Sequence, residues 1–189
     1  MPSNRILTLP NLITFARLGL LPVLLWSLAV REYETAFWLF VAASVGDGLD
    51  GFLARRLNQI SRLGAVLDPI ADKLTILGIA WILAAEGVLP VWIAALMTLR
   101  DLVIVSGALA YRQLVGSLEM APTRLSKLNT VLEFVLLACA LMLANRWIPA
   151  EPWLSPYLYL VACTVVGSGA QYVWVWGRKA KAHHDAHRH

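Results

Sequence analysis

Four aspartates, arranged in two pairs, are the residues of this sequence best suited to chemistry. Asp47 and Asp50 are separated by two residues, and Asp68 and Asp72 by three. On a helix that turns by about 100° per residue, the first pair lies about 60° apart and the second about 40° apart. Each pair therefore shares one face of its helix, and the short connection between the pairs predicts antiparallel neighbouring helices whose carboxylates converge.

Such a cluster of carboxylate oxygens suits hard divalent cations such as magnesium, manganese or calcium. Four ionised carboxylates carry a charge that one divalent cation does not balance and two do. We therefore expect two cations, Mg²⁺ or Mn²⁺, about 3.5–4 Å apart. A site of this kind neutralises phosphate oxygens and stabilises the charge on a departing phosphate.

Small residues accompany the aspartates at helical spacing. Gly51 follows Asp47 by one turn, Ala54 by two turns, and Gly64 precedes Asp68 by one turn. Small residues in membrane helices commonly serve close helix packing, and that alternative stays open here. Beside converging carboxylates, we interpret them as the floor of a ligand groove. Arg55 would offer a bidentate guanidinium to a phosphate in that groove.

The elements that must position these residues are membrane helices. The chain has 189 residues, 59% of them hydrophobic and 15% charged, with a mean hydropathy of +0.65. This composition is typical of an integral membrane protein, in which an ionised carboxylate costs about 2.5–3.5 kcal/mol and needs a function. Apolar stretches predict six spans, at residues 11–30, 35–56, 62–85, 89–114, 124–145 and 154–177. We predict a single all-α membrane domain over residues 1–189, a six-transmembrane-helix bundle.

The distribution of basic residues predicts the orientation of this bundle. Arg31 and Arg146 fall in connections on one side, whereas most other Lys and Arg residues, among them Arg55 and Arg178, fall on the opposite side. The positive-inside rule then places both termini in the cytoplasm. The formal charge of +4 forms no soluble basic face, so no nucleic-acid partner is expected. Arg17 and Pro22 interrupt the first apolar stretch, and we expect no cleavable signal peptide.

The spacing Asp47-x-x-Asp50-Gly51-x-x-Ala54-Arg55, eight residues, Gly64-x-x-x-Asp68-x-x-x-Asp72 resembles the complete signature of the CDP-alcohol phosphotransferase (phosphatidyltransferase) family. The resemblance implies a CDP-linked donor, divalent metal, release of CMP and usually a homodimer. It assigns metal ligation to Asp47, Asp50, Asp68 and Asp72. It assigns the CDP site to Asp50, Gly51, Ala54, Arg55 and Gly64. It also makes Asp72 the expected general base that takes the proton of the acceptor alcohol.

Segments outside the signature resemble one branch of the family. Residues 9–17 look like the opening of the branch that contains phosphatidylglycerophosphate synthases and cardiolipin synthases, and Asn11, Thr14 and Arg17 would contact donor phosphates or the metal cluster, or else cap and anchor the helix. Arg100-Asp101 and residues 122–130 look more like the cardiolipin synthases. This implies transfer from CDP-diacylglycerol to phosphatidylglycerol, giving cardiolipin. The alternative acceptor is glycerol 3-phosphate.

Arg100 and Lys127 suit the acceptor, because both candidate acceptors carry a phosphate. Arg100 has an alternative role, in which Asp101 or a neighbouring helix neutralises it. We also expect a location in the bacterial inner membrane, with the active site facing the cytoplasm. The His-rich segment 183–189 is assigned no role.

A divalent-cation transporter is the alternative from another class, because carboxylates within the membrane also mark ion pathways. The clustering of the aspartates at one side, and Arg55 beside them, favour the phosphotransferase.

Overall fold

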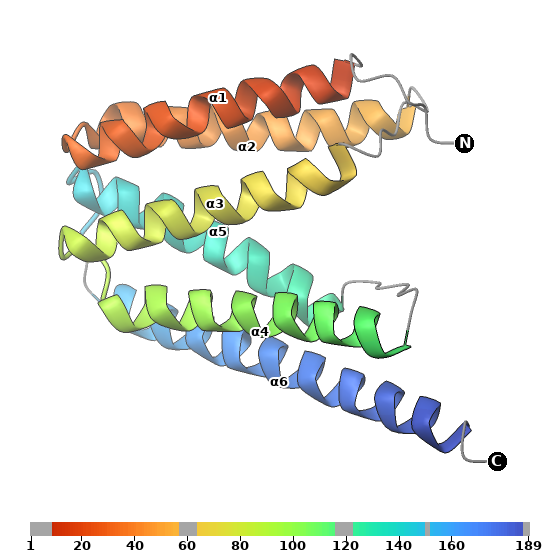
Figure 1. The fold of residues 1–189 in the computed structure, drawn as a ribbon. Coiled ribbons are helices and arrows are strands. Elements are labelled where there is room, and N and C mark those ends of the chain that lie inside the picture. Colours follow the sequence, from red (N-terminus) through yellow and green to blue (C-terminus); the bar gives the residue numbers. More distant parts are fainter. Residues whose placement is uncertain (1–8, 57–63, 116–122, 150–151, 187–189) are drawn as a thin grey trace. The chain divides into compact units, whose positions relative to one another are not determined.

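The structure, a computed structural model, describes residues 9–56, 64–115, 123–149 and 152–186, and side chains within 15–46, 70–110, 123–149 and 152–178. Within these ranges the chain forms six α-helices and no strand (Figure 1): α1 (Leu9–Ala29), α2 (Tyr33–Arg56), α3 (Gly64–Ala85), α4 (Val91–Val115), α5 (Arg124–Ala144) and α6 (Leu154–Ala186). The all-α prediction is confirmed. The predicted ranges match within about two residues, except that α6 continues beyond residue 177.

Three of these helices are long and apolar enough to cross a membrane, judged over the described residues. They contribute Val91–Ala110, Arg124–Ala144 and Leu154–Arg178, and α1 contributes the shorter apolar stretch Phe15–Ala29. Large apolar side chains such as Trp26, Leu102 and Tyr159 lie exposed on the helices, as expected where lipid is the solvent. The chain is therefore a membrane protein. The count of six spans and the cytoplasmic placement of the termini stay predictions.

Three helices end in the same kind of turn. The backbone takes a left-handed conformation at Arg31 (φ 65°), Gly87 (φ 74°) and Arg146 (φ 59°), each two positions beyond the last residue of α1, α3 or α5. In each turn the next amide bonds to a carbonyl five residues earlier, as in a Schellman motif: Glu32 to Ser27, Val88 to Leu83 and Trp147 to Met142. These bonds satisfy carbonyls that the helix end would otherwise leave open, and they allow short connections.

The chain divides into two compact units. The first contains α1, α2, α3 and the end of α5, and α1 packs against both α2 and α3. Gly78 of α3 permits the close approach of α1, since a Cβ at that position would lie 2.9 Å from Cδ2 of Leu25. Arg31 and Glu86 form an ion pair at 2.6 Å beside Tyr33. Burial raises the pKa of Tyr33, and the negative charge of Glu86 raises that pKa further.

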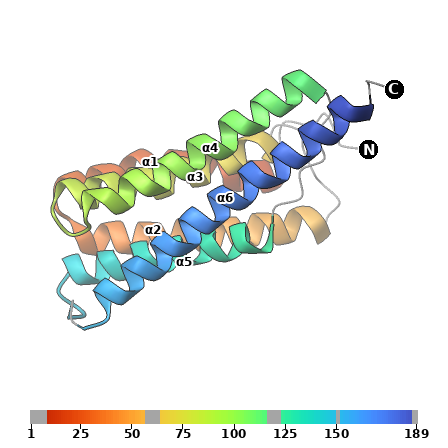
Figure 2. The same cartoon turned by 90° about the horizontal axis from the view of Figure 1, so that it is seen from below.

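The second unit contains α4, the first part of α5 (Arg124–Leu136) and α6. Helices α4 and α6 pack along buried apolar side chains that include Ile93, Met97 and Val165. The indole of Trp176 lies against Gly107, where a Cβ would fall 1.7 Å from a ring carbon, so only glycine fits. Helix α6 is the longest, with 33 residues, and it carries the chain to its C-terminus (Figure 2).

Candidate active site

The backbone of the first unit brings the four aspartate positions to one end of that unit. Asp47 and Asp50 lie in the last turns of α2, and Asp68 and Asp72 lie in the first turns of α3. The C-terminal end of α2 and the N-terminal end of α3 lie at the same end of the unit in both views (Figures 1 and 2). The backbone positions of both pairs therefore lie toward that same end of the first unit.

Asp72 is the one signature residue whose side chain is described. The side chains of Asp47, Asp50, Gly51, Ala54, Arg55, Gly64 and Asp68 lie outside the described side chains, as do those of Asn11 and Thr14. Among the described side chains, no three His, Cys, Asp or Glu residues gather into a metal site. That search reaches only one of the four predicted ligands, so the metal cluster stays a prediction.

Asp72 forms a hydrogen-bonded ion pair with Arg17 of α1. Nη1 of Arg17 donates to Oδ1 of Asp72. The Arg17 side chain is 5% exposed and that of Asp72 is 43% exposed, so the guanidinium approaches from the interior and the carboxylate keeps an open side. A carboxylate has about four lone-pair positions, so a carboxylate of this kind can accept a hydrogen bond and also bind a metal cation. Arg17 thus contacts one of the four predicted metal ligands, and the roles of Asp72 as ligand and as general base stay predictions.

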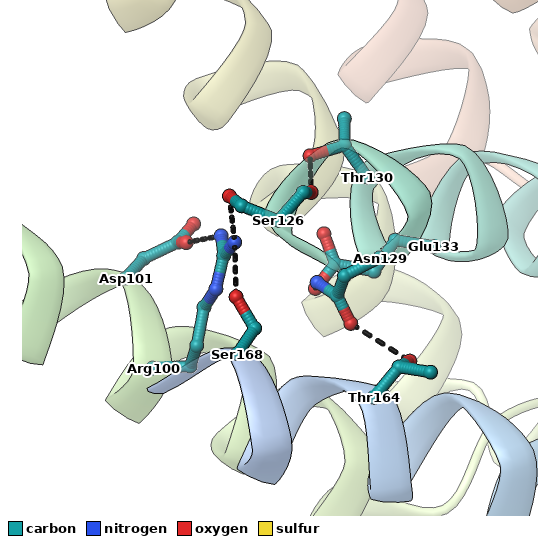
Figure 3. Close-up of polar contacts among 8 residues, drawn as sticks. All are labelled: Arg100, Asp101, Ser126, Asn129, Thr130, Glu133, Thr164 and Ser168. Atoms are coloured by element: carbon teal, nitrogen blue, oxygen red, sulfur yellow. Dashed lines mark hydrogen bonds and ion pairs between the residues drawn. The ribbon is translucent and has the colours of Figure 1, made fainter. Parts of the chain in front are cut away.

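Arg100 lies in the second unit, where three helices hold its guanidinium (Figure 3). Nη1 donates to Oδ1 of Asp101 at 2.7 Å, and Nη2 donates to Oγ of Ser126 on α5 at 2.8 Å and of Ser168 on α6 at 3.1 Å. Only 4% of the Arg100 side chain is exposed. The contact with Asp101 and with the neighbouring helices is the internal role that the sequence left open. Nε of Arg100 is buried and has no hydrogen-bond partner among the described residues.

A second polar group follows Ser126 along the same face of α5. Nδ2 of Asn129 donates to Oε1 of Glu133 at 2.7 Å, and Oγ1 of Thr164 on α6 donates to Oδ1 of Asn129 at 3.0 Å. Asn129 is 0% exposed and Glu133 1% exposed. Figure 3 shows these residues beside the Arg100 group. Together they form a polar seam: Arg100, Asp101, Ser126, Asn129, Glu133, Thr164 and Ser168.

Sequence reasoning missed most of this seam. The available signal was the spacing of Ser126, Asn129 and Glu133 by three and four residues, which places polar groups on one face of an otherwise apolar helix. The N-terminus of α5 sets that face, because Thr123 caps the helix and its Oγ1 accepts the amide of Ser126 at 3.1 Å. Lys127 follows Ser126 directly, and it is exposed, whereas Asn129 and Glu133 of the seam are buried.

Most of the chain matches a known protein family. The sequence model of the CDP-alcohol phosphatidyltransferase family matches residues 7–168. A Schizosaccharomyces pombe protein named as a cardiolipin synthase (CMP-forming) and mitochondrial hydrolase fusion is 34% identical over 89% of this chain and 31% of its own length. The human cardiolipin synthase (CMP-forming) is 32% identical over 71% of this chain and 50% of its own length.

A relative with another name is similarly close. The chloroplastic CDP-diacylglycerol–glycerol-3-phosphate 3-phosphatidyltransferase 1 of Oryza sativa subsp. japonica is 30% identical over 89% of this chain and 57% of its own length. The chain thus spans between about a third and somewhat more than half of the length of these curated relatives.

Proposed function

Because this chain belongs to the CDP-alcohol phosphatidyltransferase family, we propose that it transfers a phosphatidyl group from CDP-diacylglycerol to a hydroxyl of phosphatidylglycerol, giving cardiolipin and CMP. The observation that carries the proposal is the complete aspartate signature at the ends of α2 and α3, within the matched residues. Family membership favours phosphatidyl transfer over the alternative of a divalent-cation transporter.

On the donor side, we assign the metal ligands to Asp47, Asp50, Asp68 and Asp72, and the CDP contacts to Gly51, Ala54, Arg55 and Gly64 with Asp50. Two divalent cations, Mg²⁺ or Mn²⁺, would neutralise the diphosphate and the charge that develops on the leaving CMP. Arg55 would hold a donor phosphate through two parallel hydrogen bonds.

The chemical step forms one oxygen–phosphorus bond and breaks another. The acceptor's hydroxyl oxygen attacks the phosphorus that carries the diacylglycerol group, and the bond from that phosphorus to the bridging oxygen breaks, so that CMP leaves with the electron pair. The hydroxyl proton passes to the Asp72 carboxylate. Arg17 balances the negative charge of this carboxylate from the buried side, while the exposed side faces the reacting alcohol.

The two relatives named as cardiolipin synthases support phosphatidylglycerol as the acceptor. The name of the Oryza relative supports glycerol 3-phosphate as a second candidate acceptor. Both acceptors carry a phosphate, for which we assign Arg100 and Lys127. Arg100 retains the Nε donor for such an oxygen, and Lys127 offers an exposed ammonium. Because Arg100 contacts Asp101, a bound phosphate would share the guanidinium of Arg100 with a carboxylate.

The remaining features of the proposal concern the whole chain. We propose a single domain with six membrane spans, both termini in the cytoplasm, a homodimeric assembly, and a bacterial inner membrane with the site facing the cytoplasm. The mitochondrial and chloroplastic names of the relatives make an organelle membrane the competing location.

Product analysis tests the proposal directly. The purified chain, supplied with CDP-diacylglycerol and magnesium, is given phosphatidylglycerol or glycerol 3-phosphate separately, and the lipid product is identified by mass spectrometry. We expect cardiolipin and CMP from phosphatidylglycerol, and no CMP in excess EDTA. Phosphatidylglycerophosphate formed from glycerol 3-phosphate, with no cardiolipin from phosphatidylglycerol, would select the second acceptor. Full turnover in EDTA that added metal does not change would refute the two-metal assignment.

A further inference from the structure

The guanidinium of Arg100 is held more firmly than charge neutralisation requires. Asp101 alone balances its charge through Nη1 at 2.7 Å. Two further oxygens, from Ser126 and Ser168, both accept from Nη2 and come from two other helices. Three bonds from three helices define the plane of the guanidinium, whereas the ion pair with the adjacent residue leaves that plane free to turn.

Orientation matters for this side chain because an arginine binds phosphate through a rigid planar fork. A flexible arginine loses side-chain entropy when it binds, and a side chain already ordered by its neighbours does not. Ser168 is fully buried on α6 and Ser126 is half-buried near the start of α5. Both hydroxyls occupy positions from which they order Arg100 before any ligand arrives.

We propose that Ser126 and Ser168 are positioning residues, which orient the Arg100 guanidinium for the phosphate of the acceptor. This inference rests on the proposed function, in which Arg100 contacts that phosphate. The serines do not touch the substrate, and they act through Arg100. Nε, which is buried and has no hydrogen-bond partner among the described residues, is the donor that this orientation leaves for an oxygen of the acceptor.

The competing explanation is that the serines only join helices, as hydroxyls often do in membrane bundles. The same seam supplies a matched control for that explanation. Thr164 of α6 donates to Asn129 of α5 at 3.0 Å, a partly buried hydrogen bond that joins the same two helices without involving Arg100. A second control is Ser106, an exposed serine of α4 whose hydroxyl bonds to backbone carbonyls of its own helix.

The test is steady-state kinetics on the full chain in lipid–detergent micelles, with donor and acceptor varied separately. Ser126→Ala and Ser168→Ala should each raise the acceptor KM about tenfold, the effect of losing a hydrogen bond to a charged group. The donor KM should change less than twofold. Ser126→Thr keeps a hydroxyl and should restore the acceptor KM. Thr164→Val and Ser106→Ala should leave both KM values near those of the unsubstituted chain.

Several results would overturn the inference. They are an unchanged acceptor KM in Ser126→Ala, an equal rise of both KM values, or the same acceptor-specific rise in Thr164→Val. If Ser168→Ala does not fold, the half-buried position 126 decides alone. If the unsubstituted chain makes no product from either acceptor, the proposed function fails and this inference fails with it. If product forms and the serine variants behave normally, only the positioning role fails.

Discussion

Asp72 has one observed contact and one proposed chemical role, and the two draw on different properties of a carboxylate. Its oxygen accepts a hydrogen bond from the buried guanidinium of Arg17, which the neutral amide of an asparagine also accepts. In the proposed mechanism its negative charge takes up the proton of the acceptor alcohol, which an amide does not do. Replacement by asparagine therefore separates the structural contact from the chemistry.

We expect Asp72→Asn to lower kcat about 10²–10⁴-fold, the usual contribution of a general base, with a much smaller change in donor affinity. Retention of the contact with Arg17 should keep the thermal unfolding midpoint close to that of the unsubstituted chain. Asp50→Ala is the comparison, because loss of a metal ligand that also lines the CDP site should impair both turnover and donor affinity. Normal turnover of Asp72→Asn across the pH range would remove this residue from the role of base.

At the level of the elements, two helix ends place a non-glycine residue in the left-handed conformation, which lowers the stability of the fold. Arg31 and Arg146 take the left-handed conformation after α1 and α5, and Gly87 takes the same conformation at the equivalent position after α3. The left-handed conformation costs a residue with a Cβ about 1–2 kcal/mol, because the Cβ approaches the backbone closely, and glycine avoids this cost. Arg31 also forms an ion pair with Glu86, whereas Arg146 is exposed, so position 146 tests the backbone term more cleanly.

We expect Arg146→Gly to stabilise the protein by about 0.5–1 kcal/mol, since relief of the left-handed strain exceeds the added entropy of the unfolded glycine. Gly87→Ala is the reciprocal change and should destabilise by about 1 kcal/mol or more. A Cβ at Gly87 meets no atom within 4 Å, so this loss would come from the backbone alone. Unfolding midpoints in detergent measure both. A lower midpoint for Arg146→Gly would contradict the strain argument.

At the level of the whole molecule, the membrane determines how the acceptor reaches the site. Phosphatidylglycerol arrives laterally through the lipid, so its effective concentration is its mole fraction in the bilayer. Glycerol 3-phosphate arrives from water, so its bulk concentration sets the rate. The two proposed acceptors therefore differ in their dilution behaviour as well as in their products.

We predict that cardiolipin formation in reconstituted vesicles follows the mole fraction of phosphatidylglycerol and stays constant when total lipid changes at fixed composition. The measurement is initial CMP release over a series of vesicles, with the CDP-diacylglycerol fraction held constant. Varying the CDP-diacylglycerol fraction alone provides the control for donor dilution. A rate that depends on dissolved glycerol 3-phosphate and ignores the phosphatidylglycerol fraction would indicate the second acceptor.

The sequence by itself determined the helices, the membrane environment and the family. Hydropathy sets these features locally, since an apolar run of about 20 residues in lipid must become a helix, and polar breaks set its ends. The aspartate signature is local as well, because its spacing within α2 and α3 carries the resemblance that the family match confirms. The fit of six predicted ranges to six helices follows from the same short-range rules.

Only the tertiary structure decided which side chains meet. Arg17 and Asp72 are 55 positions apart, and Arg100 and Ser168 are 68 apart, so no periodicity within one helix predicts either contact. The contact of Arg100 with Ser168 depends on how α6 packs against α4, where the indole of Trp176 lies against Gly107. A buried hydroxyl and an exposed one look alike in sequence, and the packed helices distinguish Ser168 from Ser106.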